Sequence, residues 1–165
     1  MTATLLTVGS FAAISSANAA SPTSSSFGVS MNVESICTID AAPVAVVLAA
    51  TEAGKATTAV TATTDLILNC SKDSVAVIGL TPASTTSLDG TGTLLGGDLG
   101  AEEVAYKLTS GSASGTAWGT TNTVSTAAFA DYATAITTPI YLTVTSDADV
   151  KPGSYSDTIN ISVAY

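Results

Sequence analysis

The chain has 165 residues, four Lys, no Arg, no His and 13 acidic residues, which gives a formal net charge of −9. This length fits one domain, and the shortage of basic side chains argues against nucleic acid or an anionic membrane surface as a partner. The lack of His excludes Ser-His-Asp catalysis and any acid-base role of an imidazole.

The first 19 residues have the pattern of a cleaved export signal. Met1 to Ala13 is apolar with small side chains, and Ala17-Asn18-Ala19 has the small-x-small pattern that signal peptidase accepts. The alternative, a membrane anchor, needs a longer apolar run with less Ser and Thr. We therefore expect residues 1–19 to be removed and the chain to be exported.

An alternating segment follows a flexible leader. Residues 20–26 are rich in Ser, Thr and Pro and contribute nothing to a core. Phe27, Val29, Met31 and Val33 then alternate with small or polar residues, so in a strand they share one face. Alternation does not distinguish a strand that packs within its own sandwich from one that adds to another molecule, and both pairings stay open.

Cys37 and Cys70 are the two cysteines. An even number of cysteines in an exported chain predicts a disulfide, and the alternative is a pair of buried thiols. Two sulfur ligands without His are too few for a zinc site.

The remaining chain shows strand periodicity, interrupted by Gly, Ser and Asp clusters such as 89–92, 96–98 and 110–115. Several short strands with such turns predict an all-β sandwich. The Ala-rich stretch 127–135 has the composition for a helical turn, and Trp118 is expected in the core. After the short apolar run 43–49, four further strands are predicted, each named here by its apolar residues: Leu66, Leu68 and Cys70 in the first; Val75 and Val77 in the second; Val104, Tyr106 and Leu108 in the third; Ile140, Leu142 and Val144 in the fourth.

The last predicted strand carries Ile159, Ile161, Val163 and Tyr165 on one face, and no turn or further strand follows it in the sequence. If this strand lies beside a missing partner, its backbone groups are unpaired and the core is open next to it. The alternative is a strand that pairs on both sides.

Neither a catalytic, nor a cofactor, nor a metal site is expected. The acidic pairs Glu102-Glu103 and Asp147-Asp149 lack the spacing of a calcium loop. The glycines at 90, 92, 96 and 97 are followed by neither a helix nor a Lys, which argues against a phosphate-binding loop.

The C-terminal segment 152–165, with Gly153-x-Tyr155-x-Asp157 before an alternating strand and a terminal aromatic, resembles the ending of the spore coat protein U domain family, which includes the major pilins of archaic chaperone–usher pili. The positions of Cys37 and Cys70, Val104-Ala105-Tyr106 and Trp118-Gly119 match the same family in the same order. The resemblance covers nearly all of the chain after residue 19.

The resemblance implies an incomplete immunoglobulin-like sandwich, completed by a strand from a neighbouring subunit. Residues 20–33 would be the leader and donor strand, with Phe27, Val29, Met31 and Val33 as the inserted side chains, and 34–165 the pilin domain. The strand with Ile159, Ile161, Val163 and Tyr165 would line the groove. The implied partners are a periplasmic chaperone, an outer-membrane usher and identical subunits, and the implied location is a cell-surface pilus.

Three other functions remain as alternatives. A spore- or cell-coat protein would share the family without forming the fibre. A secreted adhesin or other carbohydrate-binding module is a further alternative; a tip adhesin would need a binding domain in addition to a pilin domain, and this length fits only one domain. A secreted enzyme is disfavoured because no catalytic constellation is recognisable.

Overall fold

The structure is a computed structural model that describes residues 24–43, 60–96 and 102–165. The predicted export signal, residues 44–49 of the predicted run 43–49 and part of the loop 96–98 lie outside the described residues. The chain divides into two units, Met1–Asn32 and Val33–Tyr165. Within the described residues, no helix is long and apolar enough to cross a membrane.

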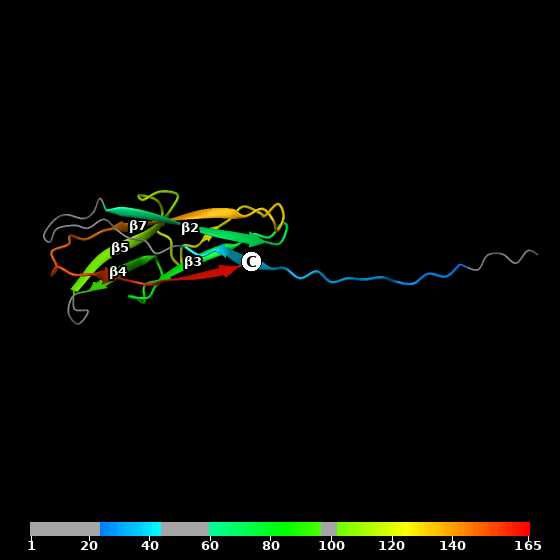
Figure 1. Ribbon diagram of the computed structural model, residues 1–165, viewed down its shortest axis with the longest axis horizontal. Coiled ribbons are helices and arrows are strands. Elements are labelled where there is room, and N and C mark those ends of the chain that lie inside the picture. Colours follow the sequence, from blue (N-terminus) through cyan, green and yellow to red (C-terminus); the bar gives the residue numbers. More distant parts are fainter. Residues whose placement is uncertain (1–23, 44–59, 97–101) are drawn as a thin grey trace, which may run out of the picture. The chain divides into compact units, whose positions relative to one another are not determined.

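The second unit is built entirely from strands where it is described, as predicted (Figure 1). Alternating, β-branched sequences such as Thr61–Cys70 favour this conformation because each strand presents one apolar and one polar face. The strands are β1 (Cys37–Ala41), β2 (Thr61–Cys70), β3 (Val77–Pro82), β4 (Thr91–Gly96), β5 (Glu102–Ser110), β6 (Val124–Ser125), β7 (Ile136–Val144), β8 (Tyr155–Ser156) and β9 (Ile159–Ala164).

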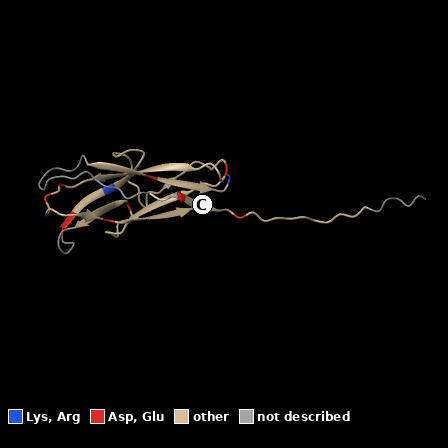
Figure 2. Ribbon diagram, viewed as in Figure 1, with Lys and Arg blue, Asp and Glu red and all other residues tan. Residues whose placement is uncertain are grey.

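Two sheets make up this unit. One has six strands in the order β1-β2-β7-β5-β4-β8, and the other has three in the order β6-β3-β9. All pairings are antiparallel; β1 pairs with β2 through Cys37 opposite Cys70, and β9 pairs with β3 through Ala164 opposite Val77. Few charged residues lie along the strands (Figure 2).

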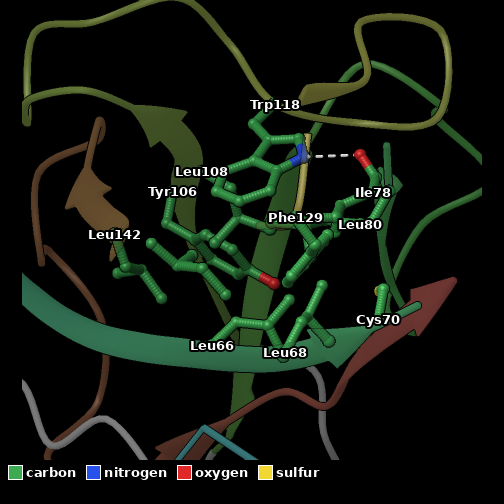
Figure 3. Packing of buried hydrophobic residues seen from close by; sticks show 12 residues of the cluster. Leu66, Leu68, Cys70, Ile78, Leu80, Tyr106, Leu108, Trp118, Phe129 and Leu142 are labelled. Carbon is green, nitrogen blue, oxygen red and sulfur yellow. Dashed lines mark hydrogen bonds between the residues drawn. The ribbon is translucent and has the colours of Figure 1, made fainter. Parts of the chain in front are cut away.

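The core lies between the inner faces of the two sheets (Figure 3). As predicted, Trp118 is fully buried, and its indole Nε1 donates a hydrogen bond of 2.9 Å to the carbonyl of Ile78. Gly90 has a φ of +86°, and a Cβ there would lie 2.2 Å from the carbonyl oxygen of Trp118, so the loop before β4 needs glycine at this position. The fully or almost fully buried apolar side chains include Leu66, Leu68, Cys70, Ile78, Leu80, Tyr106, Leu108, Trp118 and Phe129.

Two predictions about local structure are wrong. Val75 precedes β3 and is exposed, while Ala76, Ile78 and Leu80 point inward and are buried. β3 begins at Val77, so Val77 starts the strand as predicted and Val75 does not; successive side chains of a strand point to opposite faces, and here the even-numbered residues face the core. The stretch 127–135 forms no helix; its Phe129 is buried in the core, with its backbone N–H and carbonyl bonded to Ser74 and Asp73.

Cys37 and Cys70 form a disulfide, as predicted. They face each other at the start of β1 and the end of β2, which are directly paired. The bond closes a loop with a sequence separation of 33 residues. We call this part of the second unit the disulfide end. It also holds the start of β3, because only six residues separate Cys70 from Val77, and the end of β9, because Ala164 pairs with Val77.

Residues 24–32 of the first unit form no strand. The strand predicted for 27–33 is therefore not formed in this single chain, and Phe27, Val29, Met31 and Val33 are 76–88% exposed. A strand is stable when its backbone groups are paired with a second strand. Among the described residues, these four apolar side chains thus stay largely exposed in one alternating row.

Candidate functional site

β9 is an edge strand whose core-facing side chains are incompletely covered. It pairs with β3, and no other described strand pairs with its second edge. Ile159, Ile161 and Val163 pack against the core but stay partly exposed, whereas Ile78 and Leu80 on the neighbouring β3 are fully buried. The core-facing side chains of β9 are thus less covered than those of β3, and β9 has a neighbouring strand on one side only among the described strands.

β1 shows the same feature at the edge of the larger sheet. Among the described strands it pairs with β2 alone. Cys37 faces the core and is partly buried, and Ile39, on the same face two residues later, is 47% exposed. The start of β1 lies at the disulfide end, and so does the end of β9, which Figure 1 draws in red. Among the described strands, each sheet thus has an edge strand at this end, β1 in one and β9 in the other, and the free edge of a strand is a template for an added strand.

Asp157 fixes the point where the chain passes from β8 in one sheet to β9 in the other. Its carboxylate accepts hydrogen bonds from the hydroxyl of Tyr106 at 2.6 Å, from the backbone N–H of Thr158 at 2.7 Å and from the N–H and hydroxyl of Ser84. Burial raises the pKa of Tyr106 well above its ordinary value, and the hydrogen bond to Asp157 raises it further. Tyr106 therefore remains a neutral donor, and the network joins both sheets at the start of β9.

Replacing Asp157 by Ala is expected to destabilise the second unit. Each buried donor left without an acceptor costs about 1–3 kcal/mol, and the Tyr106 hydroxyl and the Ser84 N–H both donate to this carboxylate. Chemical denaturation followed by tryptophan fluorescence measures the loss. The control Asp147→Ala removes an exposed acid and leaves the unfolding free energy unchanged; equal stability of the two variants would contradict this role of Asp157.

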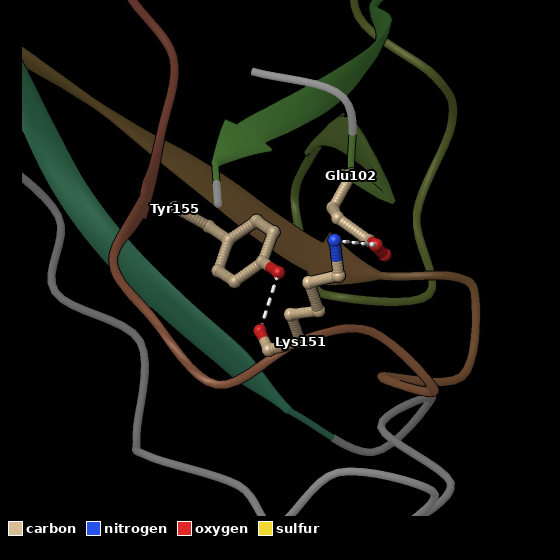
Figure 4. A network of polar contacts seen from close by, with 3 residues as sticks. All are labelled: Glu102, Lys151 and Tyr155. Carbon is tan, nitrogen blue, oxygen red and sulfur yellow. Dashed lines mark hydrogen bonds and ion pairs between the residues drawn. The ribbon is translucent and has the colours of Figure 1, made fainter. Parts of the chain in front are cut away.

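Tyr155 anchors β8 two residues before Asp157 (Figure 4). Its hydroxyl donates a hydrogen bond of 2.6 Å to the carbonyl of Lys151, and its ring lies against Gly96, where an added Cβ would approach within 2.6 Å of it. Partial desolvation and, second, the charge of Glu102 raise the pKa of Tyr155. The Lys151–Glu102 ion pair, at 3.9 Å and with a largely exposed lysine, contributes little to stability.

The structure places the predicted site residues in three groups. Cys37 and Cys70 are bonded, and Ile159, Ile161 and Val163 share the core-facing side of β9. Tyr165 lies after the end of β9 and is exposed. Phe27, Val29, Met31 and Val33 are exposed outside any strand, and whether they insert into another molecule remains a prediction.

The Asp157 network was not predicted from the sequence. The available signal was the Asp of Gly153-x-Tyr155-x-Asp157, placed directly before an apolar strand. Its partners Ser84 and Tyr106 are 73 and 51 residues away in the chain, so no local pattern connects them. Within the described residues, no group of three or more His, Cys, Asp or Glu side chains could hold a metal ion.

Comparisons with known proteins agree with this architecture. The family model described as the Spore Coat Protein U domain matches residues 23–162. None of the curated proteins compared matches the chain. Among solved structures, the chain is similar to one in the CsuC-CsuE chaperone-tip adhesion subunit pre-assembly complex, from archaic chaperone-usher Csu pili of Acinetobacter baumannii.

That match has 18% sequence identity and a TM-score of 0.55, and it covers 81% of this chain and 40% of the other. At this identity the likeness concerns the fold, an immunoglobulin-like β-sandwich. This chain spans less than half the length of the one it matches.

Proposed function

Because this chain belongs to the Spore Coat Protein U domain family, we propose that it is a structural subunit of an extracellular chaperone–usher pilus. In this proposal each subunit donates residues 27–33 to the next copy, where they add a strand to β9. The observation that carries the proposal is that one chain has two features that fit each other. Its edge strand β9 has partly covered apolar side chains, and its segment 27–33 has a row of exposed apolar side chains outside any strand.

The energy of this insertion is large enough for a stable polymer. Burying four large apolar side chains contributes on the order of 6–12 kcal/mol, at about 1.5–3 kcal/mol each. A row of main-chain hydrogen bonds between the donated strand and β9 adds to this. Dissociation of a subunit is then slow, which suits a fibre that carries load outside the cell and supports adhesion or biofilm formation.

The proposal includes a chaperone that covers the same edge before assembly, and an usher in the outer membrane that exchanges it for the next subunit. A free apolar edge invites aggregation, so a subunit in transit needs such cover. The similar solved chain comes from a complex of a chaperone with a tip adhesion subunit, which supports this kind of partner.

A coat protein without a fibre is the second candidate, favoured by the description of the family. Electron microscopy of the secreted material distinguishes the two: a pilus subunit yields filaments, whereas a coat protein yields sheets or amorphous layers. For both candidates, the net charge of −9 argues against nucleic acid as a partner.

Replacing Ile161 by Asp is expected to abolish the polymer. The substitution places a charge in the face of β9 on which the donated strand would pack, and burying an unpaired carboxylate is strongly unfavourable. The measurement is the ladder of bands that a donor-strand polymer gives in SDS gels without boiling.

The matched control is Asn160→Asp, which places the same charge one residue earlier on the exposed face of β9. This variant is expected to polymerise like the wild type. Circular dichroism confirms that both variants keep the sandwich. Val163→Thr, which keeps the side-chain shape, is expected to weaken the ladder without unfolding the domain. A normal ladder from Ile161→Asp would contradict strand addition at β9.

A further inference from the structure

The backbone just before β1 is held in line with that strand. The N–H of Ile36 donates to the hydroxyl of Ser71 at 2.8 Å, and the N–H of Ser71 donates to the carbonyl of Ile36 at 2.8 Å. Ile36 thus lies opposite Ser71, which continues the β1–β2 register by one residue beyond the disulfide. The hydroxyl of Ser35 lies 3.3 Å from that of Ser74. We call residues 35 and 36, held by these contacts, the clasp.

The clasp sets the direction in which the segment 27–33 leaves the domain. β1 begins at the disulfide end, whereas β9 ends there. If this segment covered its own domain, it would have to reverse at the disulfide end and run back antiparallel to β1 and parallel to β9. We call its four apolar side chains the apolar row: Phe27, Val29, Met31 and Val33.

A reversal that leaves the clasp intact turns the apolar row away from the core. The shortest common hairpin loops have two residues, so the loop would be 33–34 and Met31 would lie opposite Ile36. Directly opposite side chains of two paired strands share one face of the sheet. Ile36 precedes the core-facing Cys37 and is 48% exposed, so it faces outward. The whole apolar row would then face outward too, because a strand's register fixes the face of every side chain.

The other short reversals fail for related reasons. A two-residue loop at 34–35 places Val33 opposite Ile36, and so points the apolar row outward as well. A three-residue loop gives the inward register, but it ends at Ser35 or at Ile36. In the first case Val33 leaves the row and the Ser35 contact is lost, and in the second both hydrogen bonds between Ile36 and Ser71 are lost. None of these loop residues is the Gly, Asn or Asp that tight hairpin turns favour.

A self-inserted strand that bypasses β1 and lies beside β9 alone is limited by reach. β1 and β9 belong to different sheets, and packed sheets lie about 10 Å apart. From the clasped Ser35 back to Val33, two residues of chain span at most about 7 Å. While the clasp holds, Val33 therefore falls short of a strand position in the other sheet.

We propose that the clasp keeps the apolar row out of its own domain, and thereby commits each subunit to donate its strand to a second copy. This inference rests on the proposed function and adds to it the reason why donation takes place between molecules. A second copy approaches the row from outside in any direction and register, so the reversal at residues 33–36 does not restrict it. The edge of β9 then stays open until another molecule fills it.

The test is a variant whose geometry allows self-insertion. Glu34→Asn with one Gly inserted before Ser35 supplies an Asn-Gly loop, which is the strongest short sequence signal for a two-residue hairpin turn. Ser35 and the residues after it keep the clasp. The added residue shifts the register by one, so that Met31 lies opposite Cys37 and the apolar row faces the core.

Wild type and variant are refolded from denaturant with the disulfide formed. The wild type is expected to give the SDS-resistant ladder. The variant is expected to give monomers in size-exclusion chromatography and no ladder, with residues 27–33 protected from hydrogen exchange. The matched control, Glu34→Asn/Ser35→Gly, carries the same Asn-Gly turn without the added residue and keeps the hydrogen bonds of Ile36. Its row would face outward in a hairpin, so it is expected to form the ladder.

A ladder from the variant with the inserted Gly, or self-inserted monomers from the control, would overturn the role of the clasp. A wild-type monomer with residues 27–33 protected from exchange would overturn it as well, because such a molecule has inserted its own row. Wild-type protein that forms neither a ladder nor a protected monomer would overturn the proposed function, and this inference with it.

Discussion

We expect the double variant Val29→Asp/Met31→Asp to form no SDS-resistant polymer. Both side chains belong to the exposed row that would enter the neighbouring copy, and each contributes about 1.5–3 kcal/mol when buried. The substitutions remove that contribution and add two charges that insertion would have to desolvate without a partner. The variant is therefore expected to remain a folded monomer, measured by gel ladders and by size-exclusion chromatography.

The matched control is Ser30→Asp/Asn32→Asp, which adds the same charges to the same segment on its other face. In a donated strand these two side chains point away from the core of the accepting copy, and the ladder is expected to persist. Loss of the polymer in both double variants would show that charge alone, rather than the apolar face, decides assembly. Polymerisation of Val29→Asp/Met31→Asp would contradict strand donation by this segment.

The second large effect is expected from removing the disulfide. In the Cys37→Ala/Cys70→Ala variant, the unfolded chain regains the freedom of a closed loop with a sequence separation of 33 residues. The chain-entropy model puts this loss at about 3–4 kcal/mol of unfolding free energy. Chemical denaturation in the monomeric Val29→Asp/Met31→Asp background measures it without interference from the polymer.

A reducing agent provides the control for this variant. It is expected to lower the stability of the disulfide-bonded parent by a similar amount and to leave the alanine variant unchanged. A loss below about 1 kcal/mol would fall short of the range measured for the removal of a native disulfide. In that case the backbone hydrogen bonds between β1 and β2, rather than the disulfide, would hold the start of β1 in place.

Much of the fold could be predicted because its strands are local patterns. Leu66, Leu68 and Cys70 alternate in a run of ten residues, and each of them is buried as expected. The same holds for Val104, Tyr106 and Leu108 on β5. The disulfide was predictable from the number of cysteines in an exported chain, and its effect on the ends of β1 and β2 follows from their pairing.

The remainder depended on contacts between distant parts of the chain. Nothing around Val75 shows that β3 begins two residues later, and the Ala-rich composition around Phe129 is compatible with a helical turn, although tertiary packing places this ring in the core. Asp157 meets Ser84 and Tyr106 through the folding of both sheets. The half-covered state of Ile161 is a property of the assembled sandwich, because alternation alone does not show which strand lacks a neighbour.

A cryo-electron microscopy reconstruction of the secreted fibre tests strand exchange between copies most directly. We expect an additional strand beside β9 in every subunit, with density that continues into residue 34 of the adjacent molecule. If the added strand instead continued into Val33 and Glu34 of the same molecule, each subunit would complete itself, and the polymer would need another explanation.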